Sequence, residues 1–286
     1  MKSSTVQNSV LTKKEGNEMN KKIGFIGSGN MGGAMIGGII QSGLTAKENI
    51  YVSDVNEESL QRVNARYGVH TTTDNKEVAK TCDIIVLSVK PYLYPIVIKE
   101  IKDDVKDDVI IVVIAAGQSS AVVKELFERD IKIVKTMPNT PALVGEGMAA
   151  IAPASNVTPE ETAEITAIFN SFGKSEIVPE HLMDAVTAVS GSSPAYVYMF
   201  IEAMADAAVL EGMPRAQAYK FAAQSVLGSA KMVLETGMHP GELKDMVCSP
   251  GGTTIAAVAK MEETGLRNSV MQGMKACADK SRDMSK

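Results

Sequence analysis

Ile23-Gly24-Phe25-Ile26-Gly27-Ser28-Gly29-Asn30-Met31-Gly32 is the stretch of sequence that decides the fold. Its apolar start predicts a buried strand, and the glycines at GxGxxG spacing open a helix through about Ser42. The first glycine permits a tight turn, the second lets the backbone approach a pyrophosphate, and the third allows close packing of helix on strand. Amides at the helix N-terminus would face the phosphate charge. A turn without a ligand needs the same glycines, but strand, helix and a downstream acidic residue together favour a dinucleotide site.

That acidic residue is Asp54, which follows a second predicted strand, residues 50–53, and stands 22 positions after Gly32. A carboxylate there can accept hydrogen bonds from an adenosine ribose, and it would repel the 2′-phosphate of NADPH, so by itself it favours NADH. Three polar neighbours in the sequence can offset part of that repulsion: Ser53, Asn56 and Arg62. A helix N-cap is the alternative role for Asp54. The choice between NADPH and NADH therefore stays open.

Further apolar runs alternate with helical stretches up to about residue 153. The predicted strands are residues 84–89, 109–115 and 131–135, and residues 57–67 are a predicted helix. Strands that are continuously apolar are buried on both faces, as in parallel sheets. Repeated βαβ units imply a doubly wound parallel sheet with right-handed crossovers. We therefore expect an α/β fold with a dinucleotide-binding Rossmann domain over residues 21–180.

The chain after Pro179 is rich in alanine and methionine and has no strand signal. Glycine or proline separates its predicted helices, which are residues 181–212, 215–237, 240–246, 254–265 and 266 to the end. Their apolar faces are too broad to be buried within so few helices, so we expect an all-helical dimerisation domain over residues 181–286. Residues 1–20 are polar and unpatterned, and we expect a disordered N-terminal extension, with Met19 as a possible true start of translation.

Composition excludes several classes of function. The net charge of −5 argues against a general nucleic-acid binder. The longest apolar run, residues 109–116, is far shorter than the roughly 20 residues of a membrane span. The three cysteines and three histidines show no metal-ligand spacing, and no secretory signal is recognisable. We expect a cytoplasmic protein with reduced cysteines, without a metal, and with neither membrane nor nucleic acid as a partner.

Three other strand ends point to the same crevice as the glycine turn. They are Ser88-Val89-Lys90-Pro91, Ala115-Ala116-Gly117 and the rigid loop Met137-Pro138-Asn139-Thr140-Pro141. Open α/β sheets bind ligands at the carboxyl ends of their strands. Each segment alone could be an ordinary turn, but together they predict further walls of the cofactor site.

The helical part contains one candidate anion site, Ser249-Pro250-Gly251-Gly252-Thr253-Thr254, directly before a predicted helix. Two glycines at a helix N-terminus leave convergent backbone amides, which form a nest for a carboxylate. Thr254 would place a hydroxyl beside the bound anion. An N-cap without a ligand explains the same residues equally well.

The residue types that these motifs lack argue against several kinds of reaction. No His, Cys or Lys falls in a motif suited to base or nucleophile work, which argues against alcohol oxidation and acyl transfer. A protonated imine is already an electrophile, and hydride transfer to it requires mainly alignment and charge placement. Threonine is too weak an acid to be a true proton donor, but Thr254 can hold the imine nitrogen and relay a proton from water.

Together these motifs resemble the pyrroline-5-carboxylate reductase family from about Lys22 to Arg282. In the first part they are the stretches at 24–32, 88–91, 115–117 and 137–141. In the helical part they are Ser-Gly-Ser-Ser-Pro-Ala-Tyr at 190–196, Gly-Met-Pro-Arg at 212–215, His-Pro-Gly-Glu-Leu-Lys-Asp at 239–245 and Ser-Pro-Gly-Gly-Thr-Thr at 249–254. Seven ordered motifs beyond the glycine turn make a chance match improbable.

The resemblance implies reduction of 1-pyrroline-5-carboxylate to L-proline with NADPH, or NADH, as the last step of proline synthesis. It also implies interlocked dimers, often assembled into decamers, with the site shared between subunits. For the substrate it implies contacts from Glu180, Ser249, Gly251, Gly252, Thr253 and the catalytic Thr254. For the cofactor it adds Asn75 to the residues derived above, namely Ile26, Gly27, Ser28, Gly29, Asn30, Met31, Gly32, Ser53, Asp54, Asn56, Ser88, Val89, Lys90, Pro91, Ala115, Ala116, Gly117 and Asn139. Met246 stands where the family often has Asn, which puts a cofactor contact there in doubt.

Two other classes of protein remain as alternatives. The β-hydroxyacid dehydrogenases share the glycine turn and a helical second domain, but they resemble one another in a catalytic lysine on the interdomain helix. Between Leu182 and Tyr219 this chain has no lysine. A dinucleotide-binding regulator would bind cofactor without turnover, and the anion nest before residue 255 favours an enzyme instead.

Overall fold

The computed structural model describes residues 19–284, so the disordered extension expected for the first residues lies almost wholly outside the described part. The strands that the apolar runs predict are present. They are β1 (Ile23–Ile26), β2 (Ile50–Ser53), β4 (Ile84–Leu87), β5 (Ile110–Val113) and β6 (Lys132–Met137). Every residue of β1, β4 and β5 is buried, as the lack of alternation in these runs requires.

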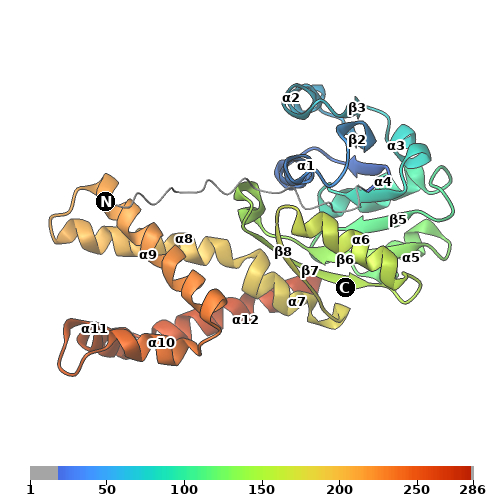
Figure 1. The fold of residues 1–286 in the computed structure, drawn as a ribbon. Helices are drawn as coiled ribbons and strands as arrows, with labels where there is room; N and C mark the ends of the chain where they lie inside the picture. The colour runs from blue at the N-terminus through green and yellow to red at the C-terminus, as the bar shows by residue number, and fades with distance from the viewer. Residues whose placement is uncertain (1–18, 285–286) are drawn as a thin grey trace, which may run out of the picture.

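The sheet has eight strands in the order β3-β2-β1-β4-β5-β6-β7-β8 (Figure 1). Strand β1 lies inside the sheet and pairs in parallel with β2 on one side and β4 on the other. The chain order therefore reverses beside β1, and this is the topological switch point at which doubly wound sheets bind ligands. The expected α/β fold with a Rossmann-like sheet is confirmed.

The sheet departs from the expected one at its far edge. Strand β7 (Gly147–Pro153) runs antiparallel to β6, and β8 (Gly173–Ile177) pairs in parallel with β7. Only η3 (Thr140–Val144) connects β6 to β7, and a connection this short returns the chain antiparallel because a parallel crossover needs a dozen or more residues. The predicted parallel sheet therefore continues, at this edge, into an antiparallel strand that the apolar runs do not predict. The apolar runs also do not predict the short strand β3 (His70–Thr72).

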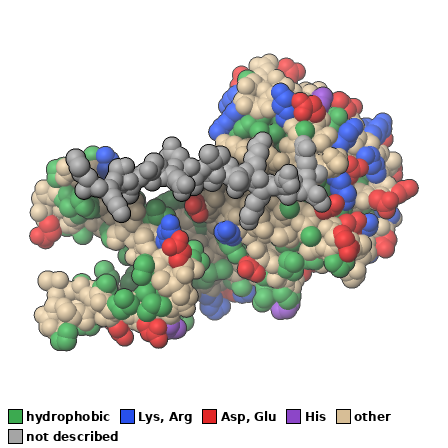
Figure 2. Space-filling model, in the orientation of Figure 1, with side chains coloured by type: hydrophobic (Ala, Val, Ile, Leu, Met, Phe, Trp, Pro, Cys, Tyr) green, Lys and Arg blue, Asp and Glu red, His purple; other side chains and the backbone are tan. Residues whose placement is uncertain are grey.

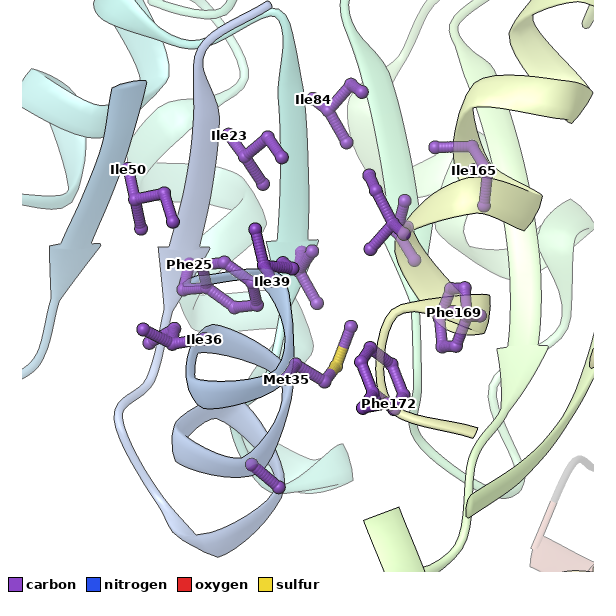
Figure 3. Packing of buried hydrophobic residues seen from close by; sticks show 14 of the residues in the cluster. Ile23, Phe25, Met35, Ile36, Ile39, Ile50, Ile84, Ile165, Phe169 and Phe172 are labelled. Atoms are coloured by element: carbon purple, nitrogen blue, oxygen red, sulfur yellow. The ribbon is translucent and has the colours of Figure 1, made fainter. Parts of the chain in front are cut away.

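Helices cover both faces of the sheet and bury two separate apolar clusters. Cluster one joins the sheet to α1 (Asn30–Ser42), α2 (Glu57–Tyr67) and α6 (Pro159–Asn170). Cluster two joins it to α3 (Asn75–Thr81), α4 (Tyr94–Ile101) and α5 (Ser120–Phe127). Figure 3 shows part of cluster one, in which Met35 of α1 points toward Phe169 and Phe172. Fully burying each such side chain contributes about 1.5–3 kcal/mol.

The chain after β8 forms a long helical arm. Its elements are η4 (Glu180–Leu182), α7 (Met183–Val186), the π-helical turn η5 (Thr187–Gly191), α8 (Ser193–Leu210), α9 (Arg215–Thr236), α10 (Pro240–Val247), α11 (Thr253–Glu263) and α12 (Leu266–Met284). The sequence predicts one helix over 181–212, but it is interrupted at η5. Gly191 and Pro194 explain the break, because glycine weakens a helix and proline fits its first turn. The expected all-helical second part is otherwise confirmed.

The arm extends away from the sheet and then returns to it (Figure 1). Helices α8 and α9 pack on each other, α10 and α11 lie at the distal end, and α12 runs back to contact α7 and η5. Many large apolar side chains of the arm are exposed in the single chain, and Figure 2 shows hydrophobic groups over its surface. Exposed apolar surface of this extent marks an interaction face. Within residues 19–284 no helix is long and apolar enough to span a membrane.

Candidate active site

The glycine turn between β1 and α1 has the geometry of a ligand-binding loop. Gly27 has φ of +105°, and a Cβ there would lie 2.8 Å from the carbonyl carbon of Ser88, so glycine is required. A Cβ on Gly32 would lie 2.7 Å from the carbonyl oxygen of Gly27. Gly29, the N-cap of α1, differs because a Cβ there would meet nothing within 4 Å. The open space over Gly29 is where a pyrophosphate could approach the amides of α1.

The end of β4 is fastened to this turn. The hydroxyl of Ser88 donates hydrogen bonds to the carbonyl oxygens of Gly27, at 2.6 Å, and of Ile26, at 3.1 Å. The backbone amide of Ser88 also donates to Ile26. Strands β1 and β4 are therefore locked together where both end, and Val89, Lys90 and Pro91 leave the sheet from that point.

The carboxylate of Asp54 is hydrogen-bonded to the glycine turn. One of its carboxylate oxygens accepts from the backbone amide of Ser28, at 2.7 Å, and from the Ser28 hydroxyl, at 2.6 Å. The other accepts from the amide of Asn56 at 2.9 Å. Burial raises the pKa of Asp54, but these hydrogen bonds outweigh it and hold the pKa below its ordinary value. Asn56, which accepts from the Ser59 amide, caps α2, so the N-cap role for Asp54 is wrong.

Asn75 joins the same edge of the sheet through side chains. The Ser53 hydroxyl donates to the Asn75 amide oxygen, and the Asn75 amide nitrogen donates to Glu100, both at 2.8 Å. Asn75 is the first residue of α3. The structure thus places Ser53, Asp54, Asn56 and Asn75 beside one another, as the cofactor hypothesis requires.

The strand ends of the other wall lie at the same edge, because β1, β4, β5 and β6 are parallel. Ala115, Ala116 and Gly117 follow β5, and Asn139 follows β6. The Asn139 amide nitrogen donates at 3.2 Å to both the carbonyl and hydroxyl oxygens of Ser190, and its oxygen accepts from Met148 at 2.9 Å. Asn139 therefore ties the loop after β6 to η5. Its hydrogen-bond partner there is Ser190, for which the sequence alone predicts no role.

The predicted anion nest stands between α10 and α11. Gly252 is the N-cap of α11, and Thr253 and Thr254 are its first residues. Gly251 has φ of +69° with open space around it, whereas a Cβ on Gly252 would lie 2.3 Å from the Ser249 hydroxyl oxygen. The amides at this helix start are free of side-chain caps, so the nest has the form that a carboxylate could occupy.

Within one chain the nest and the glycine turn belong to different parts of the molecule. Helices α10 and α11 pack on α9 and α12 at the distal end of the arm, and the glycine turn lies at the sheet (Figure 1). Glu180, expected near the substrate, lies at the junction of arm and sheet, where its Oε1 accepts from the Ser120 amide at 2.8 Å. A single chain therefore does not bring the nest residues 249–254 to the predicted cofactor residues, although Glu180 lies beside the loop that follows β5.

Comparison with known proteins covers both parts of the chain. The family model for pyrroline-5-carboxylate reductase dimerisation matches residues 180–284, and a model described as NADP oxidoreductase, coenzyme F420-dependent, matches residues 22–117. The pyrroline-5-carboxylate reductase of Escherichia coli is 52% identical, covering 94% of this chain and 100% of its own length. The chain belongs to the pyrroline-5-carboxylate reductase family. It is therefore an oxidoreductase, with a dimerisation domain through which it self-associates.

Other members of the family agree in sequence and in structure. The Methanosarcina acetivorans reductase is 45% identical over 93% of this chain and 99% of its own. The solved reductase from Coxiella burnetii has a TM-score of 0.88 at 31% identity, covering 94% of this chain and 100% of its own. The Plasmodium falciparum reductase, solved with NADP bound, has a TM-score of 0.86 at 34% identity and covers 95% and 100%.

Proposed function

We propose that this chain reduces 1-pyrroline-5-carboxylate to L-proline, the last step of proline synthesis, in the cytoplasm. The proposal rests on two helix N-termini, those of α1 and α11, at which a glycine N-cap leaves the backbone amides without side-chain caps. The chain that carries them is 52% identical to the Escherichia coli pyrroline-5-carboxylate reductase. One N-terminus suits a pyrophosphate and the other a carboxylate. The two parts of this reductase would be residues 21–180 and 181–286.

NADPH is the cofactor that the turn fits best, although NADH remains compatible with it. Asp54 keeps its negative charge, but both of its oxygens already accept hydrogen bonds from Ser28 and Asn56. Arg62 of α2 lines one cavity of about 510 Å³ together with Gly29 and Asn30, and it offers a positive charge nearby. The NADP-bound relative supports the same choice. When bound, the reduced nicotinamide supplies the hydride.

The residues of this chain would bind, orient and protonate the substrate. The amides of Gly252, Thr253 and Thr254 would hold its carboxylate, with Ser249 and Gly251 shaping the nest. The Thr254 hydroxyl would hold the ring nitrogen and relay a proton from water, since its own acidity is too low to make it a proton donor. Because a cyclic iminium is already electrophilic, this alignment is the main requirement for catalysis.

The active site would be assembled between two chains. The nest lies at the distal end of the arm, so in an interlocked dimer it would approach the glycine turn of the partner subunit. The exposed apolar surface of the arm is the face that such a dimer would bury. Further assembly of dimers into a decamer would leave this pairing unchanged.

A direct assay of NADPH oxidation tests the proposal. Purified protein should oxidise NADPH only when 1-pyrroline-5-carboxylate is added, and the product should be L-proline by mass spectrometry. Keto acids with NADPH, and hydroxyacids with NADP⁺, serve as controls for the competing dehydrogenase classes. Turnover of the cofactor with those compounds but not with the imine would contradict the proposed function.

A further inference from the structure

Lys135 is a buried lysine that the proposed reaction does not use. It lies on β6, paired with Val113 of β5 and Ala152 of β7, and only 6% of it is exposed. Ile133 and Met137, two residues away on the same face of the strand, belong to two different apolar clusters. Lys135 thus lies between two apolar clusters, one that includes residues of α5 and one that includes Met183 of α7.

Two carboxylates offset only part of the cost of burying this charge. Burial lowers the pKa of Lys135, and the charges of Glu180 and Asp184 raise it. Both acids belong to the start of the arm, in η4 and α7, and α7 packs on β6. A buried ammonium is costly without opposite charge, so removing Glu180 or Asp184 would make the burial of Lys135 more costly.

Glu180 connects this charge to the cofactor wall. Its Oε1 accepts from the amide of Ser120, the first residue of α5, at 2.8 Å. The loop between β5 and Ser120 contains Ala115, Ala116 and Gly117. A carboxylate at the positive end of α5 is stabilised by the helix dipole. Glu180 therefore fixes where this loop ends.

The returning helix α12 reaches the same loop from the other side. Its Ser281, which is 4% exposed, donates to Asp184 at 2.6 Å. Its last described residue, Met284, lies against Gly117, where an added Cβ would come within 2.9 Å of the Met284 Cβ. Figure 1 shows α12 returning to the sheet beside α7. Both ends of the arm thus converge on residues 115–120.

We propose that Lys135, Glu180 and Asp184 form a charged junction that fixes the angle between the helical arm and the loop of residues 115–120. Lys135 and Glu180 are then positioning residues for hydride transfer. The inference rests on the proposed function, in which the arm carries the nest to the partner and the loop lines the cofactor. Misplacement by about 1 Å can cost about 100-fold in rate, so a junction remote from the nest can still govern turnover.

Kinetics of Glu180→Ala test the junction, with Glu176→Ala as the control because Glu176 is an exposed carboxylate of β8. We expect kcat to fall about tenfold in Glu180→Ala while KM for the imine changes less than about twofold, because the nest is untouched. Glu180→Gln keeps an oxygen that can accept from Ser120 and should recover part of kcat. Lys135→Arg should keep more activity than Lys135→Met, because it retains the positive charge.

Hydrogen exchange gives a second reading that needs no turnover. Amides of residues 115–122 should exchange faster in Glu180→Ala than in the wild type or Glu176→Ala, with the dimer intact. Wild-type kcat together with wild-type exchange in Glu180→Ala would overturn the junction, even if Lys135→Met fails to fold. A wild-type enzyme that ignores the imine would instead contradict the proposed function, and the exchange result would still stand.

Discussion

Ser28 donates two hydrogen bonds to a single carboxylate oxygen of Asp54, one from its backbone amide and one from its hydroxyl. Asp54, which the sequence predicts as a ribose ligand, therefore also holds the glycine turn in place and acts as its clamp. The backbone amide of Asn56 donates to the other carboxylate oxygen, so both oxygens of Asp54 accept hydrogen bonds within the protein. Because the carboxylate stays charged, binding of NADPH would depend on positive neighbours such as Arg62.

Asp54→Asn should lower stability at neutral pH and lose that effect in acid. The folded-state pKa of Asp54 lies below the ordinary 3.8, so the ionised carboxylate stabilises the folded protein above that value. This contribution is lost as the pH falls through the folded-state pKa, because a protonated carboxyl resembles the amide. Urea unfolding from about pH 7 to about pH 3 should show the difference between variant and wild type shrinking below about pH 4.

Asp107→Asn is the control, because Asp107 is an exposed acid paired only at 3.4 Å with Arg129. It should differ little from the wild type across the range, as surface ion pairs contribute little. A deficit in Asp54→Asn that is as large at the acidic end as at neutral pH would contradict the clamp.

Gly29→Ala should separate folding from cofactor binding. Gly29 has ordinary extended backbone angles and a Cβ there meets nothing, so the variant should keep the wild-type Tm. The same Cβ would occupy the space that a pyrophosphate needs, so Kd for NADPH should rise at least about tenfold. Fluorescence titration with NADPH measures this without turnover.

Gly33→Ala provides the matched control for Gly29→Ala. It lies one turn further along α1 and is equally open, and alanine in a helix interior is favoured over glycine by about 1 kcal/mol. We expect unchanged or raised stability and near-wild-type affinity. If Gly29→Ala bound NADPH as tightly as Gly33→Ala does, the proposed position of the pyrophosphate would be wrong.

The local features of this fold and its parallel strands are readable from the sequence, whereas pairings that no repeated pattern encodes are not. The glycine turn and helix α2 depend on residues within a few positions, and the predicted bounds of α2 match those observed. The reversal at β7 depends on a short connection, and its alanine-rich strand carries little β-propensity. Its direction is set by pairing with β6, which no local pattern encodes.

The site shows the same division. The sequence predicts which strand ends meet, because parallel strands share an edge. It does not predict that Asn139 is held by Ser190, 51 positions away, or that Lys135 at the end of an apolar run is buried. Such contacts arise only after the arm has docked on the sheet. The distance between the nest and the glycine turn is likewise a property of the whole chain.

Thr254→Ala should impair catalysis without unfolding the arm. Loss of the hydroxyl removes the group proposed to hold the ring nitrogen, and removing a comparable donor from an active site costs about 100-fold or more in kcat. Thr254→Ser, which keeps the hydroxyl, should retain most of the activity. Steady-state kinetics with the imine and NADPH measure both variants.

Thr264→Ala controls for a threonine lost from the same helix. Thr264 lies at the C-terminal end of α11, and its hydroxyl bonds only to carbonyl oxygens of Lys260 and Met261. We expect kcat close to that of the wild type. Equal losses in Thr254→Ala and Thr264→Ala would show that α11 has a structural role only.

Phe221→Asp should dissociate the dimer and abolish activity together. Phe221 lies on α9 of the arm with 67% of its surface exposed in the single chain, where the dimerisation model matches. A charge buried at an apolar interface is strongly unfavourable, so sedimentation velocity should show monomers. Because the nest and the glycine turn of one chain are far apart, those monomers should bind NADPH but turn over no imine.

Ile96→Asp is the control, because Ile96 is almost equally exposed, at 65%, but lies on α4 of the sheet domain. This variant should stay dimeric and active. A monomeric Phe221→Asp with wild-type kcat would mean that each chain completes its own active site.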